Sequence, residues 1–233
     1  MNDKVNLSAK NPEMVEGPYY AIGGTYRSDV RDGLPGAKLE LHIQVLNAAD
    51  GTPLSGIDID LWHADAIGRY SGFDANPDEV PADLSNGQIP TNDDTFLRGR
   101  QTTDGDGKVT FLTIYPSWYA LRTPHVHLKF FEGDVCNLTT QIYFPEALNQ
   151  KLNTEHPGYA RKNEQDTFNN RDPVIATTSG DFENTWVDIA EGADGYIGHA
   201  TVIITPGEVH EPIIPPAGQI PPKGGRPHDV PVK

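Results

Sequence analysis

Apolar and polar residues alternate along much of the chain, a pattern that predicts β-strands. In the segment 38–46 the apolar residues share one face, as in a half-buried strand: Leu39, Leu41, Ile43 and Val45. The segment 56–62 repeats the pattern with Ile57, Ile59 and Leu61 pointing inward. Further strands are expected at 108–114, 125–131, 138–144 and 196–204. The predicted fold class is all-β, a β-sandwich of mainly antiparallel strands with one short helix and long loops.

The helix is expected at residues 145–156, because Pro145 stands at its start and Pro157 follows its end. The run Asp-Gly-Asp-Gly at 104–107 predicts a hairpin turn. Alternating acidic residues also occur in calcium loops, but an EF-hand loop needs a third oxygen ligand and a later glutamate that this sequence lacks.

The composition changes at Pro206, where a segment dense in Pro and Gly without periodicity begins. We therefore expect a single domain at 1–205, with 1–15 as its N-terminal lead-in, and a tail or arm at 206–233. Proline-rich chain is stiff and extended, so one hypothesis is that the arm wraps a neighbouring subunit of a homo-oligomer, with a dimer favoured. Its anchors would be Ile213, Ile214 and Ile220; the alternative is an unattached terminus.

The formal net charge of −15 argues against nucleic acid or an anionic membrane as partner, because both require clustered Lys and Arg. Cys136 is the only cysteine, which excludes an intramolecular disulfide. No apolar run approaches a signal peptide or the roughly 20 residues of a membrane span. A cytoplasmic location is the resulting expectation, unless an export signal has been removed.

Residue types that bind metals cluster at 119–127: Tyr119, His125 and His127, with Arg122 between them and a second tyrosine, Tyr70, upstream. Alternate residues of a strand share a face, so both histidines can reach one metal. Imidazole suits several metals and does not select among them. Tyrosine ligates well only as phenolate, which requires a hard, highly charged cation, so the two tyrosines favour ferric iron. The competing interpretation is a pair of histidines without a metal on a half-buried face.

Several motifs resemble the intradiol ring-cleavage dioxygenases, the non-heme ferric enzymes that open catechols between the two hydroxylated carbons. The resemblance covers residues 13–205. The motifs that carry it are EGPYY (16–20), YRSDVRDG (26–33), GTPLSGIDIDLWHADAIGRYSGF (51–73), TFLRGRQTTDGDGKVTFLTIYP (95–116), SWYALRTPHVHLKFF (117–131) and LTTQIYFP (138–145).

The resemblance implies an Fe(3+) cofactor, a catechol-type substrate with O2, and a cis,cis-muconate-type diacid product. It implies four metal ligands: Tyr70, Tyr119, His125 and His127. Tyr119, Arg122 and Gln141 would take part in catalysis, with Arg122 stabilising negative charge that develops on the ring. The substrate pocket would be lined by Gly17, Pro18, Tyr19 and Arg122. Trp62 and His63 match family positions too and are interpreted as supporting residues rather than ligands.

Two other classes remain open on the sequence. The turn-and-strand pattern at 51–68 and 102–111 also resembles transthyretin-like and carboxypeptidase-regulatory-like modules, which bind without catalysis and need neither tyrosine nor histidine at these sites. An extradiol enzyme with ferrous iron would need two histidines and a carboxylate, and no acidic residue completes the strand pattern.

Overall fold

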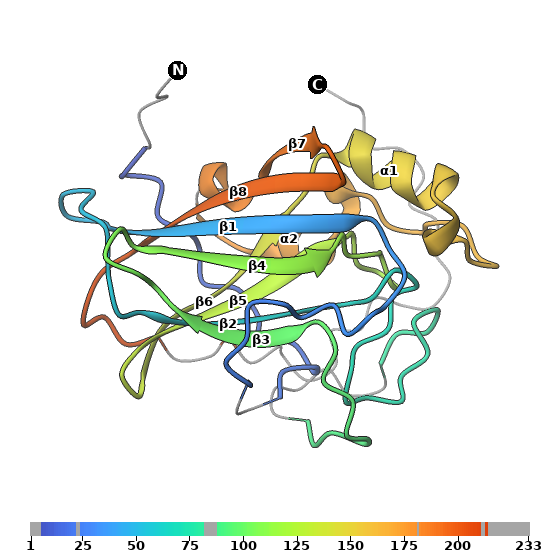
Figure 1. Ribbon diagram of the computed structural model, residues 1–233, viewed down its shortest axis with the longest axis horizontal. Helices are drawn as coiled ribbons and strands as arrows, with labels where there is room; N and C mark the ends of the chain where they lie inside the picture. The colour runs from blue at the N-terminus through green and yellow to red at the C-terminus, as the bar shows by residue number, and fades with distance from the viewer. Residues whose placement is uncertain (1–5, 22–23, 82–87, 181, 211–212, 214–233) are drawn as a thin grey trace.

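The computed structural model describes residues 6–21, 24–81, 88–180, 182–210 and 213. Two four-stranded sheets are stacked as layers (Figure 1). The first sheet contains, in spatial order, β4 (Lys108–Ile114), β1 (Lys38–Asn47), β8 (Gly195–Ile204) and β7 (Asp188–Gly192). The second contains β3 (Arg98–Thr102), β2 (Asp58–His63), β5 (His125–Glu132) and β6 (Val135–Tyr143). The predicted β-sandwich is confirmed.

Strand pairing is antiparallel throughout the two sheets except between β1 and β8, which run parallel. This agrees with the mainly antiparallel arrangement expected from the sequence. Strands β3 and β7 were not predicted, because RGRQT and DIAEG carry too few apolar residues to show an alternating pattern.

The hydrophobic core lies between the two sheets. The residues predicted to point inward from β1 and from the segment 56–62 are all buried there. On β5 the residues that face this core are Val126, Leu128 and Phe130. Because side chains alternate along a strand, His125, His127 and Lys129 point to the opposite, outer face of the second sheet. They are nevertheless buried, so other parts of the chain cover that face.

The N-terminal segment provides much of this cover and also pairs with three sheet edges. The segment 12–15 bonds along β6, the segment 25–27 bonds with β3, and the segment 28–30 bonds with β4. These contacts satisfy backbone groups that an open edge would leave unpaired. They also carry the EGPYY motif across the outer face of the second sheet.

Two α-helices are present among the described residues: α1 (Glu146–Glu155), which confirms the predicted helix, and α2 (Pro173–Thr177). Three 3₁₀ turns accompany them: η1 (Pro157–Tyr159), η2 (Asn169–Arg171) and η3 (Glu183–Thr185). None of the helices that the structure describes is long and apolar enough to cross a membrane.

The Asp-Gly-Asp-Gly run at 104–107 is a tight turn, closed by a 3.0 Å bond from the Gly107 amide to the Asp104 carbonyl. The prediction of a hairpin is wrong in one respect. The strands on either side, β3 and β4, belong to different sheets, so the turn connects the two layers. Turn residues specify the reversal of the chain but not the pairing partner of each strand.

The first part of the predicted arm lies against the domain. The His210 amide donates to the Cys136 carbonyl (3.1 Å), and the Asn137 side chain donates to the Glu208 carbonyl (2.8 Å). Of the predicted anchors, Ile213 is 41% exposed, whereas Ile214 and Ile220 lie outside the described residues. The arm therefore stays a prediction.

Candidate active site

Strand β5 places His125 and His127 side by side on the outer face of the second sheet. Their Nε2 atoms are 3.0 Å apart, and both rings are about 98–99% buried. Trp62, from the neighbouring strand β2, stacks on the His127 ring with 4.7 Å between the ring centroids. Trp62 thus packs against the candidate centre, as expected, while His63 points into the core and bonds the Thr113 hydroxyl at 2.7 Å.

Two loops bring the predicted tyrosines to the same point. The Tyr70 hydroxyl, from the β2–β3 connection, is 3.4 Å from His125 Nε2, and the Tyr119 hydroxyl is 3.5 Å from the same atom. The two phenol rings meet edge to face at 5.5 Å. All four predicted ligands therefore converge, although they come from positions up to 57 residues apart in sequence, from Tyr70 to His127.

The protonation of the histidines leaves ring nitrogens free for a cation. Burial, together with the nearby Arg122 charge, lowers the pKa of His125 and of His127 well below the ordinary value, so both rings are neutral. His125 Nδ1 lies 2.7 Å from the Thr123 carbonyl, which can only accept, so Nδ1 carries the proton and Nε2 offers a lone pair. His127 Nδ1 is buried and has no hydrogen-bond partner among the described residues. The residues fit a metal ion, which the Nε2 atoms of both histidines would help to hold.

The two phenol groups, unlike the histidines, must lose a proton to bind a metal. Burial raises the pKa of Tyr70 and of Tyr119 above the ordinary value of 10.0, so without a cation both are protonated. A highly charged cation at this point would reverse that preference and make both oxygens anionic ligands. Among the described residues, no group of three or more His, Cys, Asp or Glu side chains is arranged to hold a metal.

Arg122 lies beside these donors with each of its nitrogens directed at a different group. Nη1 is 3.4 Å from the Tyr119 hydroxyl, and Nη2 donates to Gln141 Oε1 at 2.5 Å. Nε donates to a carboxylate oxygen of Asp172 at 2.9 Å. Burial alone disfavours the cation, but Asp172 and the surrounding phenols raise the pKa of Arg122 above its usual range. The sequence predicted Arg122 and Gln141 for the site, and the structure brings them together.

The EGPYY motif packs over the cluster of two histidines and two tyrosines. Gly17 has a φ of +77°, a left-handed backbone conformation that favours glycine, and a Cβ added there would make ordinary contact with His127 Cε1 at 3.6 Å. Pro18 follows and is half-buried. The Tyr19 ring stacks on Tyr70 at 4.6 Å and meets Tyr119 edge to face at 6.3 Å. The predicted pocket segment therefore lies directly on the donors.

Two buried side chains at the site were missed by the sequence analysis. Asp172 holds Arg122, and Arg98 donates from Nε and Nη2 to the hydroxyl and carbonyl of Ser71, next to Tyr70. Asp172 precedes Pro173, and this pair of residues indicates the start of a helix. It does not indicate that Asp172 also contacts Arg122, fifty positions away in the sequence. Arg98 belongs to the quoted motif at 95–116, yet nothing in its spacing shows that it is buried.

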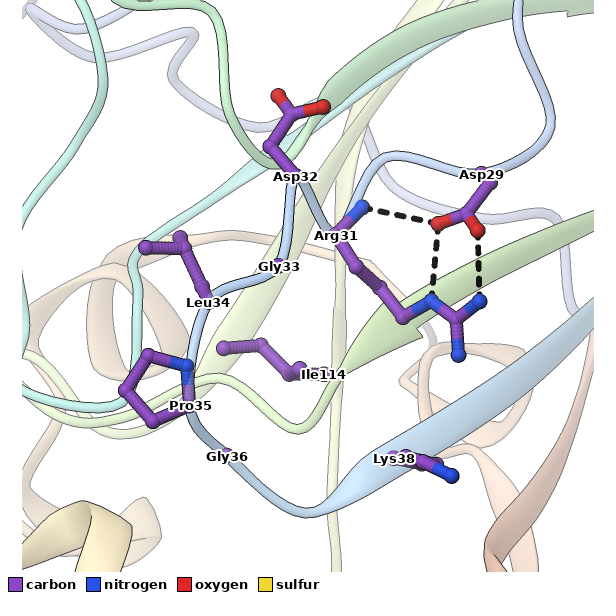
Figure 2. A pocket seen from close by; sticks show the side chains of 9 residues that line it. All are labelled: Asp29, Arg31, Asp32, Gly33, Leu34, Pro35, Gly36, Lys38 and Ile114. Atoms are coloured by element: carbon purple, nitrogen blue, oxygen red, sulfur yellow. Dashed lines mark hydrogen bonds and ion pairs between the residues drawn. The ribbon is translucent and has the colours of Figure 1, made fainter.

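A hollow of about 430 Å³ lies elsewhere on the surface (Figure 2). It is lined by the segment 29–38 and by Ile114 from the end of β4. Its charged side chains are paired: Arg31 with Asp29, Lys38 with Asp194, and Asp32 with Arg27. None of the predicted site residues lines it, so this hollow is separate from the candidate active site.

A protein-family model described as "Dioxygenase" matches residues 15–152. The chain belongs to the intradiol ring-cleavage dioxygenase family. This intradiol-family chain is 30% identical over 152 residues to chlorocatechol 1,2-dioxygenase of Cupriavidus pinatubonensis (strain JMP 134 / LMG 1197) and 34% identical over 130 residues to the protocatechuate 3,4-dioxygenase beta chain of Burkholderia cepacia. These alignments cover 60% and 51% of this chain and 57% and 50% of the relatives. The chain spans about half the length of the curated relatives it matches.

Among solved structures, the intradiol ring-cleavage dioxygenase from Tetranychus urticae is similar over 87% of this chain and 97% of its own, with a TM-score of 0.78 and 26% identity. The family resemblance and the fold predicted from the sequence are thereby confirmed. The intradiol family is generally dependent on non-heme iron. The non-catalytic sandwich module is not favoured.

Proposed function

We propose that this protein is a ferric intradiol dioxygenase that cleaves a catechol-type ring between its two hydroxylated carbons and incorporates both atoms of O2 into a cis,cis-muconate-type diacid. The observation that carries the proposal is the convergence of two phenol oxygens within 3.5 Å of a histidine Nε2 that itself lies 3.0 Å from a second one. The membership of the family and the names of the relatives support the same reaction.

Tyr70, Tyr119, His125 and His127 would hold the ion. Bound ferric iron would supply a Lewis-acidic position for the two catechol oxygens, because two anionic phenolates favour the ferric state and a hard oxygen ligand. The chain supplies the rest. The buried histidines stay neutral, and the Thr123 carbonyl fixes the tautomer of His125. The Tyr119 oxygen would accept a substrate proton.

Arg122 and the EGPYY segment would act on the substrate rather than on the ion. The guanidinium is a permanent cation beside the Tyr119 oxygen, so it stabilises negative charge on a ring held at the donors. Gly17 to Tyr19 would line the site, and the buried Tyr19 ring would help to exclude water from the reacting carbons. With O2 as the co-substrate, the atoms of the ring-opened diacid balance without an added reductant.

The decisive experiment combines iron quantification, visible absorption and product analysis on the purified protein. We expect one bound iron per chain, a broad tyrosinate-to-iron charge-transfer band that moves to longer wavelength when catechol is added without oxygen, and a diacid product when oxygen is supplied. Tyr70→Phe and Tyr119→Phe should change the band and remove most turnover. Tyr26→Phe is the control, because that tyrosine is 62% exposed and its hydroxyl bonds Asp58 rather than any of the predicted ligands.

Two outcomes contradict the proposal. A protein that binds no iron after ferric reconstitution would leave only the non-catalytic sandwich. A ring-opened aldehyde acid in place of the diacid would indicate extradiol cleavage.

A further inference from the structure

Arg122 is fixed in one orientation by two neighbours. Asp172 receives the Nε hydrogen at 2.9 Å, and Gln141 receives one from Nη2 at 2.5 Å. A guanidinium is planar, so two bonds on different nitrogens determine where the third nitrogen points. That third nitrogen, Nη1, faces the Tyr119 hydroxyl.

Asp172 is fully buried, and its carboxylate accepts four hydrogen bonds. Oδ1 accepts the amides of Val174 (2.9 Å) and Ile175 (3.2 Å) and so caps α2. Oδ2 accepts Arg122 Nε and the Thr123 amide (3.0 Å). One oxygen therefore holds the short helix, and the other holds the loop that carries the site residues.

The bond to Thr123 extends the influence of Asp172 to a second site residue. The Thr123 carbonyl is the acceptor that fixes the tautomer of His125, at 2.7 Å from Nδ1. The Thr123 hydroxyl donates to Asn169 at 2.6 Å, which docks the same loop on the turn before α2. The orientation of Arg122 and the position of His125 thus depend on one segment, residues 169–175.

We propose that Asp172 is a positioning residue for this active site: it aims Arg122 at the reacting ring and secures the loop that orients His125. Asp172 lies outside the range 15–152 that the family model matches, whereas the predicted ligands and pocket residues lie within it. The segment around α2 therefore completes the site from outside the matched range. The effect on turnover rests on the proposed function, whereas the effect on the Arg122 side chain does not.

Asp172→Asn is the informative substitution. It keeps the size of the side chain and an oxygen that can cap α2, but it places an NH2 group or a neutral oxygen against Arg122 Nε. We expect kcat with catechol to fall about 10- to 100-fold, with a smaller change in KM, as is typical when a group supporting site residues is removed. Asp166→Asn, an exposed aspartate six residues upstream, is the matched control and should retain wild-type kcat.

A double-mutant cycle separates positioning from simple support of the fold. If Asp172 acts through Arg122, adding Asp172→Asn to an Arg122→Gln variant should lower kcat by far less than the 10- to 100-fold loss expected in the wild type, because the aimed group is already gone and only the loop that orients His125 is still affected. If the two losses multiply, the proposal is wrong. The double variant is neutral at both positions, so it also serves if Asp172→Asn alone fails to fold.

The second readout needs neither iron nor turnover. In the iron-free full-length protein, the Arg122 Nε–H should give a slowly exchanging NMR resonance, assigned by its loss in Arg122→Gln. Asp172→Asn should move it or speed its exchange, and Asp166→Asn should not. An unchanged resonance overturns the proposal. If the wild-type protein turns over no catechol, the proposed function fails, and this resonance still decides whether Asp172 holds Arg122.

Discussion

Replacing Lys129 with Met should destabilise the protein by about 3–5 kcal/mol, because it leaves the Glu16 carboxylate buried without a cation. Lys129 follows His127 on the same face of β5, and its ammonium group pairs with Glu16 and lies 4.4 Å from the Tyr20 ring. The two charged side chains are only 9% and 6% exposed. Methionine keeps most of the aliphatic packing of lysine, so the loss comes mainly from the unpaired charge.

The free energy of unfolding is measured by urea titration followed through tryptophan fluorescence. Adding Glu16→Gln to Lys129→Met should restore part of the stability, since it removes the unpaired charge. Glu16 precedes Gly17 above His127, so the single variant should also bind iron more weakly.

The control is Lys151→Met, which breaks an exposed Lys–Glu pair. Lys151 lies 3.4 Å from Glu191, with side chains 48% and 70% exposed, so its removal should cost less than about 1 kcal/mol. Equal losses in Lys129→Met and Lys151→Met would refute the reasoning that burial makes the Glu16 pair costly to break.

Two further predictions concern stability. Burial lowers the pKa of His63 from 6.5 to about 4. Neutral His63 therefore contributes to the free energy of unfolding above pH 6.5, and this contribution is lost as the pH falls toward 4. Over that range, urea titrations should show the wild type losing up to ~3 kcal/mol more stability than His63→Gln. Gly68→Ala should cost about 2–4 kcal/mol, because a Cβ there would lie 2.6 Å from the Trp118 carbonyl oxygen at a φ of +88°. Gly33→Ala, at a φ of +73° with open space around it, should cost only about 1 kcal/mol, and equal losses would contradict the steric argument.

Much of the candidate site was predictable because its chemistry is local in sequence. His125 and His127 are two apart on a strand, so the period of β-structure alone puts them on one face. Tyr70, Arg122 and Gln141 came from the family resemblance, and the structure places them around the same point. The edge strand β7 was not predictable, because DIAEG has too few apolar residues to show an alternating pattern. The partner strands of the 104–107 turn were not predictable either, because their pairing depends on contacts between distant segments.

The sequence by itself determined most of the strands, their sheet faces and the residue types able to bind ferric iron, because these follow from side-chain periodicity and ligand chemistry. Only the tertiary structure decided which charges are buried and paired. Asp172 and Glu16 look in the sequence like any other acidic residues, yet the fold removes each from water and sets it against a cation of the site. Burial and partner choice arise when distant segments pack together, so the environment of each charge is a property of the whole fold.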